Sequence, residues 1–310
     1  MLKYSVKRIF MMLLTLFIII TITFFLMHMI EGDPLASMAK TLPETTRKNF
    51  YAKYGLDKPV EEQYKIFMEG LVTRGDLGES IAYPGRQISQ TIADTAPISA
   101  QWGFVAMFVG IIIGIALGVI AALNRGKWPD YLVSVIAMLG VCIPVFIFAS
   151  LLQYLFAVKL KWVPTSGWGT PSHYVLPVLA SCFGTIATYA RYTRSNVLEV
   201  LNQDFILTAQ AKGVSRAGIL VKHVMRNAML PLVTMIGPQV AAVFTGSFVL
   251  ERMFSIPGLG FYFYNSVTGR DYTMIIGTTI FYAALFVVSN FIVDLLYGLV
   301  DPRIRVGGRR

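Results

Sequence analysis

The chain has 310 residues, of which 55% are hydrophobic and 14% are charged. Soluble domains carry about 25% charged residues, so the composition excludes an ordinary water-soluble protein and indicates a membrane protein. The net charge of +10 does not indicate nucleic-acid binding, because the basic residues flank apolar runs and form no continuous aromatic and basic face. We therefore expect an all-α membrane protein whose surroundings are the lipid bilayer.

The first apolar stretch covers 9–30 and follows Lys3, Lys7 and Arg8. A secretory signal peptide has a similar charged start, but its apolar core is only about 7–15 residues long. At about 1.5 Å per residue, the stretch is long enough for the roughly 30 Å hydrocarbon core. The pattern predicts a first span that is not cleaved.

Five more apolar stretches follow, which makes six expected transmembrane helices. Basic residues concentrate in the segments that lie inside if the N-terminus is cytoplasmic, and the short outer loops hold few of them. The positive-inside rule then places both termini in the cytoplasm. The second to sixth stretches cover 98–123, 132–158, 174–190, 230–250 and 275–300, and a basic tail occupies 301–310.

Prolines interrupt several of the apolar stretches, and three of them are candidate hinges. Pro144 lies midway along the third stretch, and Pro231 and Pro238 lie near the start of the fifth. Proline removes a backbone hydrogen bond and kinks a helix, so we predict these three positions as candidate hinges. The alternative is that they are plain structural bends, because proline is common in membrane helices.

Small residues inside the stretches predict packing rather than chemistry. Gly110, Gly114 and Gly118 recur every four residues, a spacing that lets two helices approach closely. Cys142 and Cys182 each lie in an apolar run and have no metal-binding spacing. We expect both cysteines to be small buried apolar residues and predict no disulfide.

The long outer loop, residues 31–97, is too polar to cross a bilayer. Pro59 marks a helix start, and the turn 75–78 follows. Between them, apolar residues recur at helical spacing, so the loop predicts an ordered helical cap. This cap either contacts an external partner or packs on the spans. The recurring residues are Val60, Tyr64, Phe67 and Leu71.

The inner segment 191–229 is the most informative part of the chain. Gly213 suits a helix C-terminus, and Ser215 suits the N-cap of a second helix. The segment therefore predicts a short helix, a tight turn and a second helix that enters the membrane. The short helix docks either into a protein groove or onto anionic lipid. The residues at helical spacing are Phe205, Thr208, Ala209 and Lys212.

The motifs of this segment resemble the cytoplasmic coupling loop of ABC-importer permeases of the oligopeptide, dipeptide and nickel subfamily, most of all the B-type oligopeptide subunit. The resemblance rests on 209–213 (AQAKG), 226–231 (RNAMLP), 75–78 (GDLG), 249–260 (VLERMFSIPGLG), 270–272 (RDY) and 301–305 (DPRIR). It implies the type I ABC importer fold. It also implies three parts: 1–94 as the first helix and long outer loop, 95–300 as the permease domain with coupling loop 191–229, and 301–310 as the tail.

The resemblance further implies the partners. These are a second, homologous permease subunit, two ATP-binding subunits that hydrolyse ATP, and an extracytoplasmic binding protein, at the bacterial cell membrane. The family loop begins with a glutamate that is absent here, since Leu207-Thr208-Ala209 occupies that place. Any salt bridge assigned to that glutamate is therefore in doubt. The implied contact residues for the ATPase are Phe205, Leu207, Thr208, Ala209, Lys212 and Gly213.

The sequence predicts no catalytic or metal-binding residue and no cofactor bound by the chain itself. A phosphate loop requires an earlier glycine where Ala121 stands, and Gly126-Lys127 is followed by Trp128. The three histidines are dispersed along the chain, which does not suggest a zinc site. The resemblance implies that the chain is a membrane permease subunit that forms half of the translocation pathway of an ATP-driven importer of oligopeptides or dipeptides, and not an enzyme. The alternatives are a permease for nickel or another small solute, or an ion-coupled carrier.

Overall fold

The computed structural model describes residues 2–29, 43–245 and 247–300. Helices make up nearly all of the regular structure of these residues, and the one β interaction is an isolated antiparallel bridge between Glu79 and Gln87. This confirms the predicted all-α class. The chain forms two compact units, Met1–Ser99 with Phe244–Arg252 and Pro257–Arg310, and Ala100–Val243 with Met253–Ile256.

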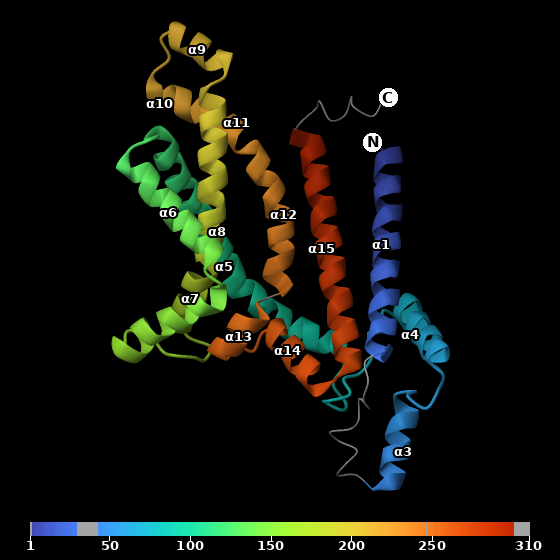
Figure 1. Cartoon of the computed structure of the whole chain (residues 1–310). Coiled ribbons are helices and arrows are strands. Elements are labelled where there is room, and N and C mark those ends of the chain that lie inside the picture. Colours follow the sequence, from blue (N-terminus) through green and yellow to red (C-terminus); the bar gives the residue numbers. More distant parts are fainter. Residues whose placement is uncertain (1, 30–42, 246, 301–310) are drawn as a thin grey trace. The chain divides into compact units, whose positions relative to one another are not determined.

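In the first unit, two long helices, α1 and α15, lie side by side and antiparallel (Figure 1). Ile20 and Phe24 of α1 pack on Ile276 and Ile280 of α15. This pairing gives the unit one of its apolar clusters. The helices of the unit are α1 (Leu2–Met29), α3 (Glu44–Lys53), α4 (Val60–Arg74), the start of α5 (Ile88–Leu123), most of α13 (Phe248–Phe254), α14 (Leu259–Gly269) and α15 (Tyr272–Val300).

The predicted cap helix is α4, and its ends lie where the sequence places them. Pro59 is its N-cap, and Gly75 closes it in the left-handed conformation with a φ of +64°. Tyr64, Phe67 and Leu71 pack against the core between α1 and α15. Packing on the long helices, one of the two predicted roles of the cap, is therefore confirmed.

In the second unit, α6 and α8 pack along each other (Figure 1). The chain then continues from α8 through α9 and α10 to α12. The helices are the rest of α5, α6 (Trp128–Cys142), α7 (Val145–Leu152), the π-helix η1 (Gln153–Lys159), α8 (Pro171–Leu201), α9 (Asp204–Ala211), α10 (Arg216–Gly218), the π-helix η2 (Ile219–Met225), α11 (Arg226–Ala228) and most of α12 (Leu230–Thr245).

The glycines of α5 form the predicted close approach. A Cβ on Gly114 would lie 2.7 Å from Cβ of Tyr189, and one on Gly118 would lie 2.6 Å from the Ala190 carbonyl oxygen, both on α8. Of the two cysteines, Cys182 is buried, whereas Cys142 is exposed. The prediction of burial was wrong for Cys142, because this residue ends α6 where the helix breaks.

Three helices of the described chain are long and apolar enough to cross a bilayer, and two bent pairs raise the number to five. The predicted third stretch differs most from expectation: it is broken, with α6 and the helical stretch Val145–Lys159 at 107° to each other. Ile143 is extended because the residue before a proline avoids the helical region. The fifth stretch ends at Thr245, and α13 is a separate helix. The single helices are Val6–Met29, Ile88–Leu123 and Tyr272–Ile292.

Candidate functional site

The candidate site is α9, the short helix in the segment 191–229. The amide of Gly213 donates to the Gln210 carbonyl at 2.9 Å, and the amide of Val214 donates to the Ala209 carbonyl at 3.2 Å. These two bonds form a Schellman motif, which requires the positive φ of +75° at Gly213. The predicted role of Gly213 as the end of the helix is confirmed.

A sharp turn connects α9 to the following helices. The hydroxyl oxygen of Ser215 accepts a hydrogen bond from the amide of Gly218 at 3.2 Å, which makes Ser215 the N-cap of α10. The chain then continues through η2 and α11 toward α12. The predicted order of helix, tight turn and second helix is therefore confirmed.

The inward face of α9 holds it firmly on its own unit. Ile206 and Ala209 are 1% and 6% exposed and belong to one apolar cluster with Val197 of α8 and Val224 of η2. Ala209 was predicted to contact a partner, but its side chain lies in this cluster. Sequence reasoning missed Ile206 as an anchor, although its spacing of three residues from Ala209 carries the signal.

Apolar side chains of α9 are exposed on both sides of its buried face. The side chains of Phe205 and Leu207 are 43% and 64% exposed, and Thr208 and Lys212 are exposed beside them. Asp204 in the first turn and Lys212 at the C-cap complement the helix dipole. Such an exposed surface can bind an apolar groove in another protein, and it has no geometry for bond chemistry.

Two polar interactions that the sequence did not reveal hold the ends of the segment 191–229 in place. Arg194 of α8 donates two hydrogen bonds to the carboxylate of Asp130, from Nε to Oδ1 at 2.5 Å and from Nη2 to Oδ2 at 2.9 Å. Asn196 of α8 donates from Nδ2 to the Ala228 carbonyl at 3.1 Å. Both pairs are far apart in sequence, so no local pattern predicts them.

The three predicted hinge prolines lie at different kinds of position. Pro144 is the N-cap of α7, at the 107° break. Pro231 is the second residue of α12, beside the 49° bend between Arg216–Ala228 and Leu230–Phe244. Pro238 lies inside α12. Motion at these positions stays a prediction.

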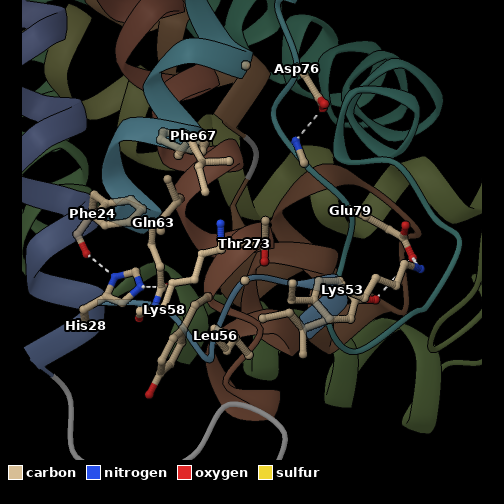
Figure 2. Close-up of a pocket in the computed structure, with 18 of the residues that line it drawn as sticks. Phe24, His28, Lys53, Leu56, Lys58, Gln63, Phe67, Asp76, Glu79 and Thr273 are labelled. Atoms are coloured by element: carbon tan, nitrogen blue, oxygen red, sulfur yellow. Dashed lines mark hydrogen bonds and ion pairs between the residues drawn. The ribbon is translucent and has the colours of Figure 1, made fainter. Parts of the chain in front are cut away.

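The first unit contains a cavity of about 450 Å³ between α1, α3, α4 and α15 (Figure 2). Figure 2 shows His28, whose ring lies between the Phe24 carbonyl at 2.8 Å and Oε1 of Gln63 at 3.1 Å. On another side of the cavity, Lys53 Nζ lies 2.6 Å from Oε1 of Glu79. Across the described residues, His, Cys, Asp and Glu do not gather into a group that could hold a metal ion.

Comparison with known proteins assigns the chain to a family. Residues 114–306 match the family model described as "Binding-protein-dependent transport system inner membrane component", and residues 1–100 match the model of the N-terminal part of such membrane components. The chain belongs to the inner membrane components of binding-protein-dependent transport systems. These are membrane permease components and not enzymes.

Within this family, the chain is similar to peptide permeases. It is 44% identical over 306 residues to the dipeptide transport system permease protein DppB of Bacillus subtilis, covering 99% of each chain. It is 40% identical to the oligopeptide transport system permease proteins OppB of Haemophilus influenzae and Escherichia coli, covering 98% of this chain and 100% of each relative. The resemblance to B-type peptide permeases is confirmed.

Solved structures show the same fold. A crystal structure of an amino acid ABC transporter with histidines superposes with a TM-score of 0.52 at 16% identity, covering 69% of this chain and 94% of that chain. The inward-facing MetNI methionine ABC transporter also superposes with a TM-score of 0.52, at 19% identity, covering 67% of this chain and 97% of that chain. The backbone comparison confirms the predicted ABC importer permease fold.

Proposed function

We propose that the chain is one of two permease subunits of a bacterial ATP-driven importer for dipeptides or oligopeptides. A second, homologous permease subunit completes the pathway, and an extracytoplasmic binding protein delivers the substrate. Two ATP-binding subunits hydrolyse ATP, and one of them docks on α9. The peptide substrate is supported by the similarity to dipeptide and oligopeptide permeases over nearly the whole chain.

The observation that carries the docking proposal is the two-sided character of α9. Ile206 and Ala209 fix the helix to its own unit, while Phe205 and Leu207 remain exposed at its surface. A helix that is rigidly attached and has exposed apolar side chains can transmit a movement of its partner. When the helix moves, the packed cluster beneath it moves too. Thr208, Lys212 and Gly213 complete the proposed contact, and Ala209 supports it from below.

The rival interpretation is that α9 lies on anionic lipid. A lipid-bound helix places basic residues beside its apolar face, whereas α9 carries one acidic residue, Asp204, and its nearest basic residue is the C-cap Lys212. The balance of charge on the helix favours a protein groove.

The test is co-purification of the ATP-binding subunits with the membrane subunits in mild detergent. We expect Leu207→Asp to abolish co-purification and peptide uptake while the subunit still reaches the membrane, because a charge in an apolar groove is costly. Val72→Asp on α4 is the matched control, since Val72 is an apolar residue that is 76% exposed. Retained ATP-binding subunits and normal uptake in Leu207→Asp would refute the proposal.

We further propose six spans with both termini in the cytoplasm. The antiparallel pairing of α1 and α15 supports this arrangement, as does α8, whose 31 residues give about 46 Å of helix. The three parts 1–94, 95–300 and 301–310 belong to the same proposal. Accessibility of single cysteines to a membrane-impermeant thiol reagent tests it, and labelling of a cysteine near residue 5 in intact cells would contradict it.

A further inference from the structure

The junction between α11 and α12 leaves the Ala228 carbonyl without its helical partner. In a continuous helix the amide of Leu232 would donate to the carbonyl of Ala228. Here this amide donates to the Met229 carbonyl at 3.0 Å, beside the bend at Pro231. Ala228 is 1% exposed, so its carbonyl oxygen needs another donor.

The donor comes from a different helix. Asn196 of α8 lies next to the fully buried Val197, and its Nδ2 donates to the Ala228 carbonyl oxygen at 3.1 Å. Asn196 precedes α9 by eight positions, and Ala228 ends α11, one residue short of α12. This side chain therefore links the two ends of the stretch that contains α9 at the bend, and it adds to the apolar packing of Ala228 in the same cluster as Val197 and Ile206.

We propose that Asn196 is a positioning residue that holds the bend between α11 and α12 and so makes α12 follow α9. The proposal rests on the proposed function, in which α9 receives the movement of an ATP-binding subunit. With the bond in place, α8, α11 and the start of α12 move as one body. Without it, the Ala228 carbonyl is unsatisfied, and only apolar packing links the bend to α9, so that α12 follows α9 less closely.

The experiment uses the complete transporter, with its second permease, ATP-binding subunits and binding protein, in proteoliposomes. Asn196→Asp keeps the shape of the side chain but places an acceptor against the carbonyl. Asn196→Ala removes the side chain without adding charge. The matched control is Asn227→Asp, because Nδ2 of Asn227 makes the same kind of bond, at 2.7 Å, to His223 within its own helical stretch.

The measured quantity is peptide uptake per ATP hydrolysed, which a role in stability alone would not change. We expect both Asn196 variants to keep the ATP-binding subunits and to hydrolyse ATP, while uptake per ATP falls about five- to tenfold, as expected for one lost hydrogen bond of about 1–1.4 kcal/mol. The Asn227 variant should remain close to the unmodified protein.

Two outcomes would overturn the proposal. One is unchanged uptake per ATP in both Asn196 variants. The other is loss of assembly in both variants, which would show that the bond serves only the stability of the complex. Failure of this proposal is distinguishable from failure of the proposed function. If Leu207→Asp releases the ATP-binding subunits while the Asn196 variants stay coupled, α9 is the docking site and Asn196 is not its link.

Discussion

The hydroxyl of Ser80 donates a hydrogen bond to Oδ2 of Asp271 at 2.5 Å, although the two residues are 191 positions apart. The same carboxylate accepts from the amides of Ile81 at 3.1 Å, Ala82 at 3.2 Å and Met274 at 3.0 Å. Asp271 is 1% exposed. One buried carboxylate therefore ties the turn at 80–82 to the start of α15.

We expect Asp271→Ala to lower the free energy of unfolding by about 2–4 kcal/mol, because several buried donors lose their acceptor. The amides of Ile81 and Ala82 should also exchange with deuterium faster. Thermal unfolding and hydrogen exchange of the purified protein measure both effects. Asp57→Ala at an exposed position is the control. Equal stability of the two variants would show that this carboxylate does not hold the turn.

The ion pair of Lys53 and Glu79 predicts a sensitivity to acid. The hydrogen bond from Lys53 and a second one from the amide of Gly85 lower the pKa of Glu79 from its ordinary value of 4.5. A group whose pKa is lower in the folded state stabilises the fold above its unfolded pKa. That contribution is lost as the pH falls through the lower, folded pKa.

Between about pH 6 and about pH 3, the unfolding temperature of the unmodified protein should therefore fall more than that of Glu79→Gln. Glu44→Gln is the control, because the pair of Glu44 and Lys48 is largely exposed at 70% and 75% and contributes little. If Glu79→Gln and the unmodified protein show the same acid dependence, the pair does not stabilise the cap.

Gly258 lies where a side chain has no room. A Cβ at this position would lie 2.5 Å from Oγ of Ser99 and 2.6 Å from Oε2 of Glu251, both of which are buried. Their hydrogen bonds fix the start of α14, since Ser99 donates to Glu251 at 2.7 Å and accepts from the Leu259 amide at 2.9 Å.

We expect Gly258→Ala to destabilise the protein by about 1–3 kcal/mol, since overpacking forces these partners apart. Gly269→Ala is a close control, because no atom lies within 4 Å of its Cβ position. That variant should leave stability unchanged or raise it slightly. Thermal unfolding of both purified variants measures the difference. If Gly258→Ala is as stable as the unmodified protein, the hydrogen-bond network of Ser99 and Glu251 rearranges freely.

The contact of α5 with α8 depends on glycine. A Cβ on Gly114 would meet the backbone oxygen of Ile186 at 2.9 Å, whereas one on Gly184 would lie 3.7 Å from its nearest atom. We expect Gly114→Ala to lower the unfolding temperature and Gly184→Ala to leave it nearly unchanged, because backbone atoms cannot move aside as a side chain can. A larger effect at Gly184 would contradict this assignment of the interface.

The sequence was most informative about helix ends that are set by residues close by in the chain. The cap helix α4 begins and ends as predicted, α9 ends and α10 begins as predicted, because Pro59, Gly75, Gly213 and Ser215 act on their immediate neighbours. The start of α5 was placed too late, at Ile98, because apolarity marks only part of a helix that begins at Ile88.

The sequence by itself determined the all-α membrane class, the cap, the helix and turn of the 191–229 segment, and the family, because composition, capping residues and short motifs are read from neighbouring positions. Only the tertiary structure decided that Ala209 faces inward, that the third stretch breaks by 107°, and that Asn196 meets Ala228. The physical reason is that packing and buried hydrogen bonds join residues whose separation in sequence carries no period, so their partners appear only when the chain is folded.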